Sequence, residues 1–127
     1  MSEPDRNSRR RLGQWGENVA ALQLEAKGLV LIERNWRCRD GEIDLVARDG
    51  ETVVFVEVKT RRGREFGAPE EALTSRKAQK LMHLGQLYMA EHEIDDVNWR
   101  IDLVAVELDG RGRLLRCDHI PDAVLGW

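Results

Sequence analysis

The sequence has 127 residues, lacks any long hydrophobic run and contains only two cysteines. Its apolar stretches are a few residues long, whereas a membrane-spanning helix needs about 20 consecutive apolar residues. No apolar segment follows the basic N-terminal stretch, so the sequence predicts no secretion signal. Cys38 and Cys117 form no closely spaced metal motif and give no sign of an oxidising compartment. We therefore expect a cytoplasmic protein without a membrane segment.

The sequence also lacks a dominant charge. Its 20 basic and 23 acidic residues give a net charge of −3, which argues against a protein that coats nucleic acid indiscriminately. It does not exclude a nuclease, because the carboxylates of a metal site offset basic groups that contact phosphate. The three histidines have no ligand spacing, and we expect them to be ordinary surface or hydrogen-bonded residues. Basic residues instead cluster in two short stretches: Arg6, Arg9, Arg10 and Arg11, and then Lys59, Arg61, Arg62 and Arg64.

Hydrophobic periodicity predicts a single domain over residues 9–120. A flexible tail at 1–8 precedes it, and a peripheral C-terminal tail at 121–127 follows it. Asp-Gly pairs and Gly-rich turns separate the predicted strands, and Thr74 or Ser75 is suited to cap the second helix. The expected elements are a helix at 9–27, strands at 29–37, 42–48 and 52–60, a helix from about 75 to 92, and strands at 99–107 and 113–120.

The first predicted helix has two apolar faces. One is a stripe at 3,4,3,4 spacing, and the other combines small residues with one charge, Glu17. The small residues favour close approach to another layer, and we expect Trp15, Trp36 and Trp99 to anchor the core. The stripe consists of Leu12, Trp15, Val19, Leu22 and Ala26, and the second face of Gly13, Glu17, Ala20, Ala21 and Leu24.

The predicted order α-β-β-β-α-β-β indicates an α/β fold. The first three strands form an antiparallel meander, and the second helix is long enough to be a crossover that brings the fourth strand in parallel to the third. Such a chain forms a mixed sheet covered by helices.

The strand at 52–60 carries two unexpected charges. Its apolar residues form a nearly continuous run, which is typical of a central strand buried on both faces. Glu57 and Lys59 interrupt this run two residues apart, so they point to the same face. Because an unpaired buried ion is destabilising by about several kcal/mol, both charges need a compensating role.

Asp44 interrupts the preceding strand in the same way. A two-residue turn at Asp49-Gly50 places Asp44 diagonal to Glu57, whereas a four-residue loop places the two directly opposite each other. Either even-length loop brings Asp44, Glu57 and Lys59 onto one face, with the carboxylates about 5–8 Å apart.

Two carboxylates and a lysine at this spacing suit a Mg²⁺ site, for which Mn²⁺ is a common substitute. Mg²⁺ prefers hard oxygen ligands and keeps waters that can react with a phosphodiester. Lys59 would stabilise the developing charge, and Arg61, Arg62 and Arg64 would hold flanking phosphates. The competing interpretation is a structural ion pair between Lys59 and either Glu57 or Asp44.

These residues resemble the PD-(D/E)XK nuclease superfamily, with its restriction-endonuclease-like three-layer α/β/α core. The pattern corresponds to Ile43-Asp44 followed by Glu57-Val58-Lys59, without the usual proline before the aspartate. The whole chain is similar to the small bacterial YraN-like endonuclease-related family, which in turn is similar to archaeal Holliday junction resolvases. The segments that carry this resemblance are Gly16-Glu17, Arg34-Asn35-Trp36-Arg37, Gly41-Glu42-Ile43-Asp44-Leu45-Val46, Phe55-Val56-Glu57-Val58-Lys59, Phe66-Gly67, Lys77 and Arg100-Ile101-Asp102.

The resemblance implies a metal-dependent endonuclease acting on DNA, with branched DNA as one candidate substrate. Asp44 and Glu57 would be metal ligands, Lys59 the catalytic lysine, and Glu17 a further catalytic or metal-bound carboxylate. Arg34, Arg37 and Lys77 are further candidates for nucleic-acid contact, although turn stabilisation or a solvated surface explains them equally well. A homodimer is one option, but the sequence identifies no interface.

Two neighbouring acidic residues receive a different interpretation. We expect Glu42 to be peripheral and Asp102 to pair with Arg100 or another basic group. The alternative for the whole protein is a non-catalytic module that binds nucleic acid or a partner protein on a nuclease-like scaffold.

Overall fold

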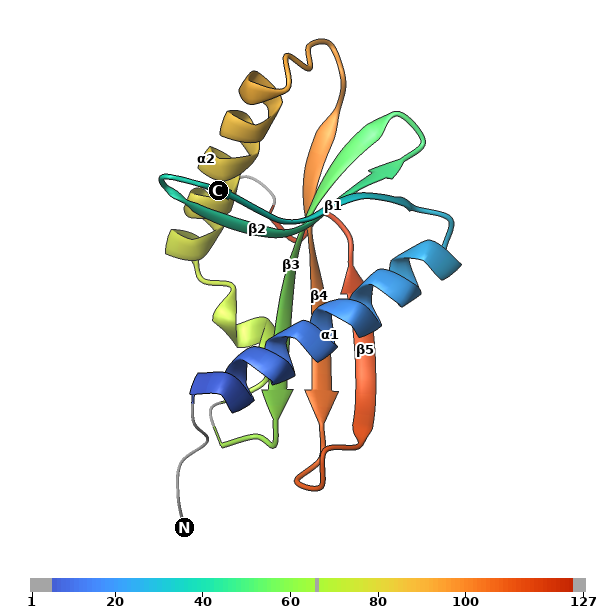
Figure 1. The fold of residues 1–127 in the computed structure, drawn as a ribbon, viewed down its shortest axis with the longest axis vertical. Helices are drawn as coiled ribbons and strands as arrows, with labels where there is room; N and C mark the ends of the chain where they lie inside the picture. Colours follow the sequence, from blue (N-terminus) through green and yellow to red (C-terminus); the bar gives the residue numbers. More distant parts are fainter. Residues whose placement is uncertain (1–5, 66, 125–127) are drawn as a thin grey trace.

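The computed structural model describes residues 6–65 and 67–124, and Figure 1 shows their arrangement. The helical and strand segments follow the predicted order, with an additional 3-10 turn, η1, before the second long helix. The elements are α1 (Arg6–Ala26), β1 (Val30–Cys38), β2 (Gly41–Asp49), β3 (Thr52–Arg62), η1 (Pro69–Ala72), α2 (Ser75–Glu91), β4 (Trp99–Leu108) and β5 (Leu114–Ile120).

The five strands form one open mixed sheet in the order β1-β2-β3-β4-β5. Strands β3 and β4 are parallel, while the other neighbouring pairs are antiparallel. The predicted crossover is therefore confirmed, because η1 and α2 connect the two parallel strands. The protein has an α/β fold.

The two helices cover opposite faces of this sheet. Ala20, Ala21 and Leu24 of α1 pack with the even-numbered apolar residues of β3. Leu81 and Leu84 of α2 belong to a second core with the odd-numbered β3 residues. Alternation along β3 thus serves two cores, and this explains why its sequence is apolar at nearly every position.

A glycine marks the point where each helix approaches the sheet most closely. A Cβ atom at Gly16 of α1 would clash with the side chain of Thr60 in β3. A Cβ atom at Gly85 of α2 would be 2.7 Å from the Trp99 ring. These glycines allow backbone-to-sheet distances that larger residues would prevent.

The hairpin between β2 and β3 differs from the preferred prediction. The turn residues are Gly50 and Glu51, because Asp49 pairs with Thr52. Gly50 has φ 61°, which suits glycine at the first central position of a tight turn. The prediction of a turn at Asp49-Gly50 is therefore wrong. The strands β2 and β3 pair in the register in which Asp44 would lie directly opposite Glu57.

Helix α1 corrects a second expectation. Its small-residue face is buried against the sheet, and Ala20 and Ala21 are fully inaccessible. Trp15, expected as a core anchor, is 37% exposed, while Trp36 is buried as predicted. The small-residue face packs against the sheet because small side chains permit a shorter distance between the helix and the sheet.

The ends of the chain also differ slightly from the prediction. Helix α1 begins at Arg6, so the described part of the expected N-terminal tail is helical, and residues 1–5 lie outside the described residues. At the other end, the Ala123 N–H donates to the Ile101 carbonyl at 2.9 Å, whereas Trp127 lies outside the described residues. Among the helices described, none is long and apolar enough to cross a membrane.

Candidate functional site

Asp44 lies where two strands of the sheet separate. The ladder between β2 and β3 ends at Leu45 and Val56, after which β2 continues with β1 alone. In this gap the Asp44 carboxylate accepts a hydrogen bond of 2.8 Å from the Val58 N–H. The side chain thus occupies the place of a ladder partner and is held at the opening of the sheet.

The half-buried Asp44 has an unusual charge environment. Burial, together with the charge and hydrogen bond of the nearby Glu57 carboxylate, raises the pKa of Asp44 from its ordinary value of 3.8 to about 8. The hydrogen bond from the Val58 N–H lowers the pKa of Asp44. Asp44 therefore carries a proton near neutral pH, and its O–H can donate to Glu57. The predicted proximity of these two carboxyl groups is confirmed.

Two further carboxylates lie beside Asp44, Glu17 of α1 and Glu42 of β2. Oxygen atoms of Glu17, Glu42 and Asp44 lie within 4.8 Å of one another, a spacing at which one cation could contact all three. Burial raises the pKa of Glu17, and the charges of Glu42 and Glu57 raise it further. Glu42 is therefore not peripheral as expected.

Asn35 connects two members of this group. Its Nδ2 lies 3.1 Å from Glu17 Oε1 and 2.8 Å from Glu42 Oε1, and it donates to both carboxylates. Asn35 has φ 52°, a left-handed conformation that asparagine adopts more readily than most residues. Sequence reasoning missed this role, although the alternation of Glu42 and Asp44 along β2 already places those two on one side.

Glu57 and Lys59 line a small cavity on the α2 side of the sheet. Its other walls come from η1, the start of α2 and Leu103 of β4. Lys77 of α2 also lines it, and the Lys77 Nζ is 3.0 Å from Glu57 Oε2. Glu57 therefore contacts the ammonium of Lys77 on one side and the Asp44 carboxyl on the other. The predicted shared face of Glu57 and Lys59 is confirmed.

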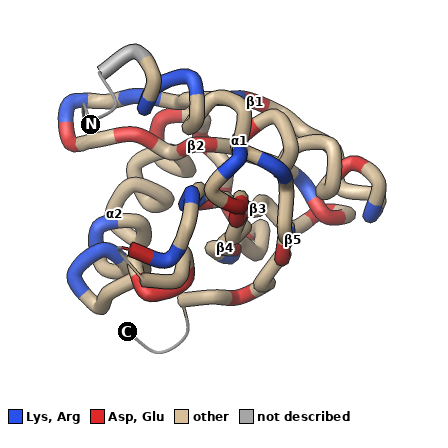
Figure 2. Tube along the Cα trace, turned by 90° about the horizontal axis from the view of Figure 1, so that it is seen from below, with Lys and Arg blue, Asp and Glu red and all other residues tan. Residues whose placement is uncertain are grey.

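The predicted nucleic-acid contacts fall into two groups. Arg34 donates to Asn18, and Arg37 to Glu42, at the β1 side of the carboxylates. Arg62 donates to the Gly110 carbonyl, while Arg61 Nε is buried without a hydrogen-bond partner. Figure 2 shows basic and acidic positions interspersed along the described part of the chain.

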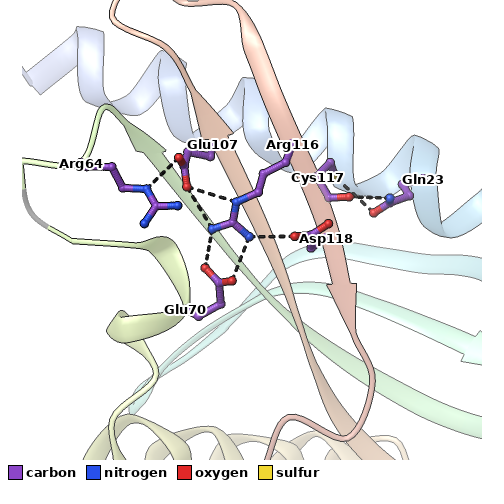
Figure 3. A network of polar contacts seen from close by, with 7 residues as sticks. All are labelled: Gln23, Arg64, Glu70, Glu107, Arg116, Cys117 and Asp118. Atoms are coloured by element: carbon purple, nitrogen blue, oxygen red, sulfur yellow. Dashed lines mark hydrogen bonds and ion pairs between the residues drawn. The ribbon is translucent and has the colours of Figure 1, made fainter.

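Arg64 belongs to a network of charged side chains that joins three elements (Figure 3). Its Nε donates to Glu107 of β4 at 2.8 Å, and the same carboxylate accepts from Arg116 of β5. Arg116 also donates to Glu70 of η1 at 2.6 Å and to Asp118 at 2.8 Å. The network anchors η1 to the sheet and so fixes one wall of the cavity beside Glu57.

Asp102 has the structural role that the sequence predicts. It is fully buried and accepts hydrogen bonds from Arg100 Nε at 2.9 Å and from the Asp122 N–H at 3.0 Å. His119 Nε2 is 2.7 Å away, and its side chain is 4% exposed. These contacts neutralise the buried carboxylate and attach the chain after β5 to β4. The expected pairing with Arg100 is confirmed.

Comparison with known sequences identifies the family. The model of the Uncharacterised protein family UPF0102 matches residues 16–106, a span that includes every site residue predicted from the sequence. The chain belongs to the UPF0102 family. This agrees with its resemblance to YraN-like proteins.

Relatives in the UPF0102 family align with nearly the whole chain. A UPF0102 protein of Beutenbergia cavernae is 53% identical over 109 residues, covering 86% of this chain and 92% of the relative. One from Symbiobacterium thermophilum is 50% identical over 114 residues, covering 90% of this chain and 96% of the relative. A third, from Roseiflexus castenholzii, is 45% identical over 117 residues, covering 91% and 94%. UPF0102 proteins thus share this domain at its full length.

Proposed function

We propose that this protein is a metal-dependent endonuclease that hydrolyses phosphodiester bonds in DNA, on a fold of the restriction-endonuclease-like type. The observation that carries the proposal is the convergence of Glu17, Glu42 and Asp44 beside Glu57 at the opening between β2 and β3. Packing carboxylates together is unfavourable unless a proton or a cation is shared among them. The Glu57-Val58-Lys59 sequence then supplies the lysine of the PD-(D/E)XK pattern.

The residues present fit a hard divalent cation. All the converging groups are carboxylates, and one of them, Asp44, is held in place by a backbone N–H. Mg²⁺ prefers such oxygen donors and retains several waters, and Mn²⁺ tolerates the same ligands. Asp44 with Glu17 and Glu42 would hold the ion, while Glu57 would contribute once its contact with Lys77 loosens. When bound, Mg²⁺ supplies an activated water and neutralises charge on the phosphate.

The protein's own groups have separate tasks in this proposal. Lys59 and Lys77 share the cavity with Glu57, where ammonium groups stabilise negative charge on the phosphate under attack. Asn35 orients Glu17 and Glu42 through its two hydrogen bonds. Arg61 and Arg62, at the end of β3, hold neighbouring phosphates of the DNA backbone.

The test is cleavage of labelled DNA by purified protein with Mg²⁺ or Mn²⁺, comparing linear, flapped and four-way branched substrates. We expect cleavage by the wild type, and none by Asp44→Asn or Lys59→Met. Glu51→Gln is the matched control, because this exposed carboxylate lies in the turn at the other end of β2 and β3. Absence of cleavage on all substrates, together with absence of metal binding by calorimetry, would refute the proposal.

A second candidate function is a non-catalytic module that binds nucleic acid or a protein. The ion pair between Lys77 and Glu57 favours it, because this contact neutralises Glu57 without a metal. In that case Asp44→Asn retains full binding to DNA or partner, whereas Arg61→Ala and Arg62→Ala weaken it. Electrophoretic mobility shifts in EDTA measure this binding, and the cleavage assay with Mg²⁺ distinguishes the two functions, because the non-catalytic module yields no product.

A further inference from the structure

Helix α1 exposes the apolar stripe that the core does not use. Leu22 is 70% exposed and Trp15 37%, while Leu12 and Val19 of the same stripe are half-buried. At 3.6 residues per turn, this stripe lies about 160° around the helix from the buried face. Figure 1 shows α1 lying across one face of the sheet, with its outer side uncovered by other elements. The helix is therefore apolar on two opposite sides, and among the described residues only one side is fully buried, while Leu22 and Trp15 on the other stay exposed.

The spacing of this stripe is that of a helix–helix seam. Residues at 3,4,3,4 intervals occupy the a and d positions of a heptad, which meet the equivalent positions of a facing helix. When two copies of α1 run antiparallel, Leu12 of each copy meets Leu22 of the other, and Trp15 meets Val19. The seam then consists of four layers, each a pair of facing apolar side chains, and the pairing is symmetric about a twofold axis.

The charges beside the stripe complement each other in the same register. Arg11 and Glu25 occupy the g positions that flank the two ends of the seam. Antiparallel pairing places Arg11 of one copy beside Glu25 of the other, and the twofold axis repeats the pair. Within one copy these residues are 14 positions apart, about 21 Å along the helix, so they cannot pair intramolecularly. Parallel pairing would instead place the g positions beside the uncharged e positions Gly16 and Gln23, without an ion pair.

We infer that α1 is the interface of a homodimer with two antiparallel α1 helices related by a twofold axis. The inference is independent of the proposed nuclease activity. Four layers on one helix make a small interface, so the dimer dissociates in the micromolar range. Glu17 lies level with the centre of the pairing along the helix, on the opposite side of α1 that faces its own sheet.

Analytical ultracentrifugation over a range of protein concentrations tests the interface. We expect a monomer–dimer equilibrium in the wild type, weakened about tenfold or more by Leu22→Glu, which removes two apolar layers. Leu115→Glu is the matched control, because Leu115 is a 58% exposed leucine on β5 and does not belong to the stripe. We expect Leu115→Glu to leave the monomer–dimer equilibrium unchanged. Circular dichroism confirms that both variants are folded.

Charge reversal tests the register. Arg11→Glu and Glu25→Arg each place like charges together and weaken the dimer by about three- to tenfold. The double variant in one chain restores both pairs and brings the dissociation constant back to within about twofold of the wild type. Arg11 also contacts Ser8 at 3.3 Å, but this exposed contact is lost equally in Arg11→Glu and in the double variant. Rescue is therefore specific to pairing between copies.

Three results would overturn the inference. One is a wild type that stays monomeric at all concentrations, and another is a dimer insensitive to Leu22→Glu. The third is a monomer that co-floats with phosphatidylglycerol vesicles unless Leu22 is changed, which would assign the stripe and the nearby arginines to a membrane surface.

Discussion

Replacing Asp44 with asparagine removes an ionisable group from a position where the folded protein disfavours its charge. Burial and Glu57 raise the pKa of Asp44 from 3.8 to about 8, so between these values the folded state binds a proton that the unfolded chain has lost. The contribution of Asp44 to the free energy of unfolding is therefore complete below about pH 4. It falls as the pH rises and is lost above about pH 8.

The size of the effect follows from the pKa difference. Each pKa unit corresponds to about 1.36 kcal/mol, so the whole pKa difference of Asp44 sets an upper limit of about 6 kcal/mol. Asparagine keeps an acceptor for the Val58 N–H and adds a donor toward Glu57, which remains in place. Because the site can admit water when Asp44 ionises, we expect Asp44→Asn to stabilise the metal-free protein by about 2–3 kcal/mol at pH 8.5.

Urea denaturation in EDTA at pH 5 and pH 8.5 measures this difference. We expect the variant to gain more stability over the wild type at the higher pH, and Mg²⁺ to stabilise the wild type more than the variant. Equal stability differences at the two pH values would refute the reasoning, because Asp44 would then have the same pKa in the folded and unfolded states.

Three further predictions concern metal binding, packing and the buried network. Mg²⁺ binding releases protons and strengthens as the pH rises toward 8, because the cation competes with the proton on Asp44; calorimetry in two buffers of different ionisation enthalpy detects this. Gly16→Ala lowers the free energy of unfolding by about 1–3 kcal/mol through its clash with Thr60, and Thr60→Ala in the same chain recovers part of the loss; urea denaturation of both variants gives the values. Asp102→Ala is destabilising by about 3–5 kcal/mol, because it leaves the Arg100 guanidinium without its principal partner; thermal unfolding monitored by circular dichroism shows a lowered midpoint, and an unchanged midpoint would contradict the buried pair.

Local sequence patterns predicted the helices and strands well, because each helix or strand depends on residues that are close together in the sequence. Thr74 was one of two suggested caps of α2, and its side chain accepts from the Lys77 N–H at 3.2 Å. The two-residue period also placed Glu57 and Lys59 on one face without reference to the rest of the chain. The position of the hairpin turn was wrong, because Asp-Gly and Gly-Glu both allow a tight turn. Packing of β2 between β1 and β3 selects the register.

The site could be predicted only in part. Asp44 and Glu57 come from adjacent strands, so their proximity follows from an even-length hairpin. Glu42 and Asn35 join the site because β2 leaves β3 at Leu45, a departure that no short-range sequence pattern marks. Likewise, the contact between Lys77 and Glu57 depends on where α2 begins relative to the sheet.

By itself, the sequence determined the order of the elements and the alternation of faces along β3, because both follow from short-range periodicity. Only the tertiary structure decided which side of α1 enters the core. Both sides of that helix are apolar, and periodicity cannot rank them. The choice depends on how closely the helix can approach β3, and Gly16, Ala20 and Ala21 make the small-residue side the tighter fit.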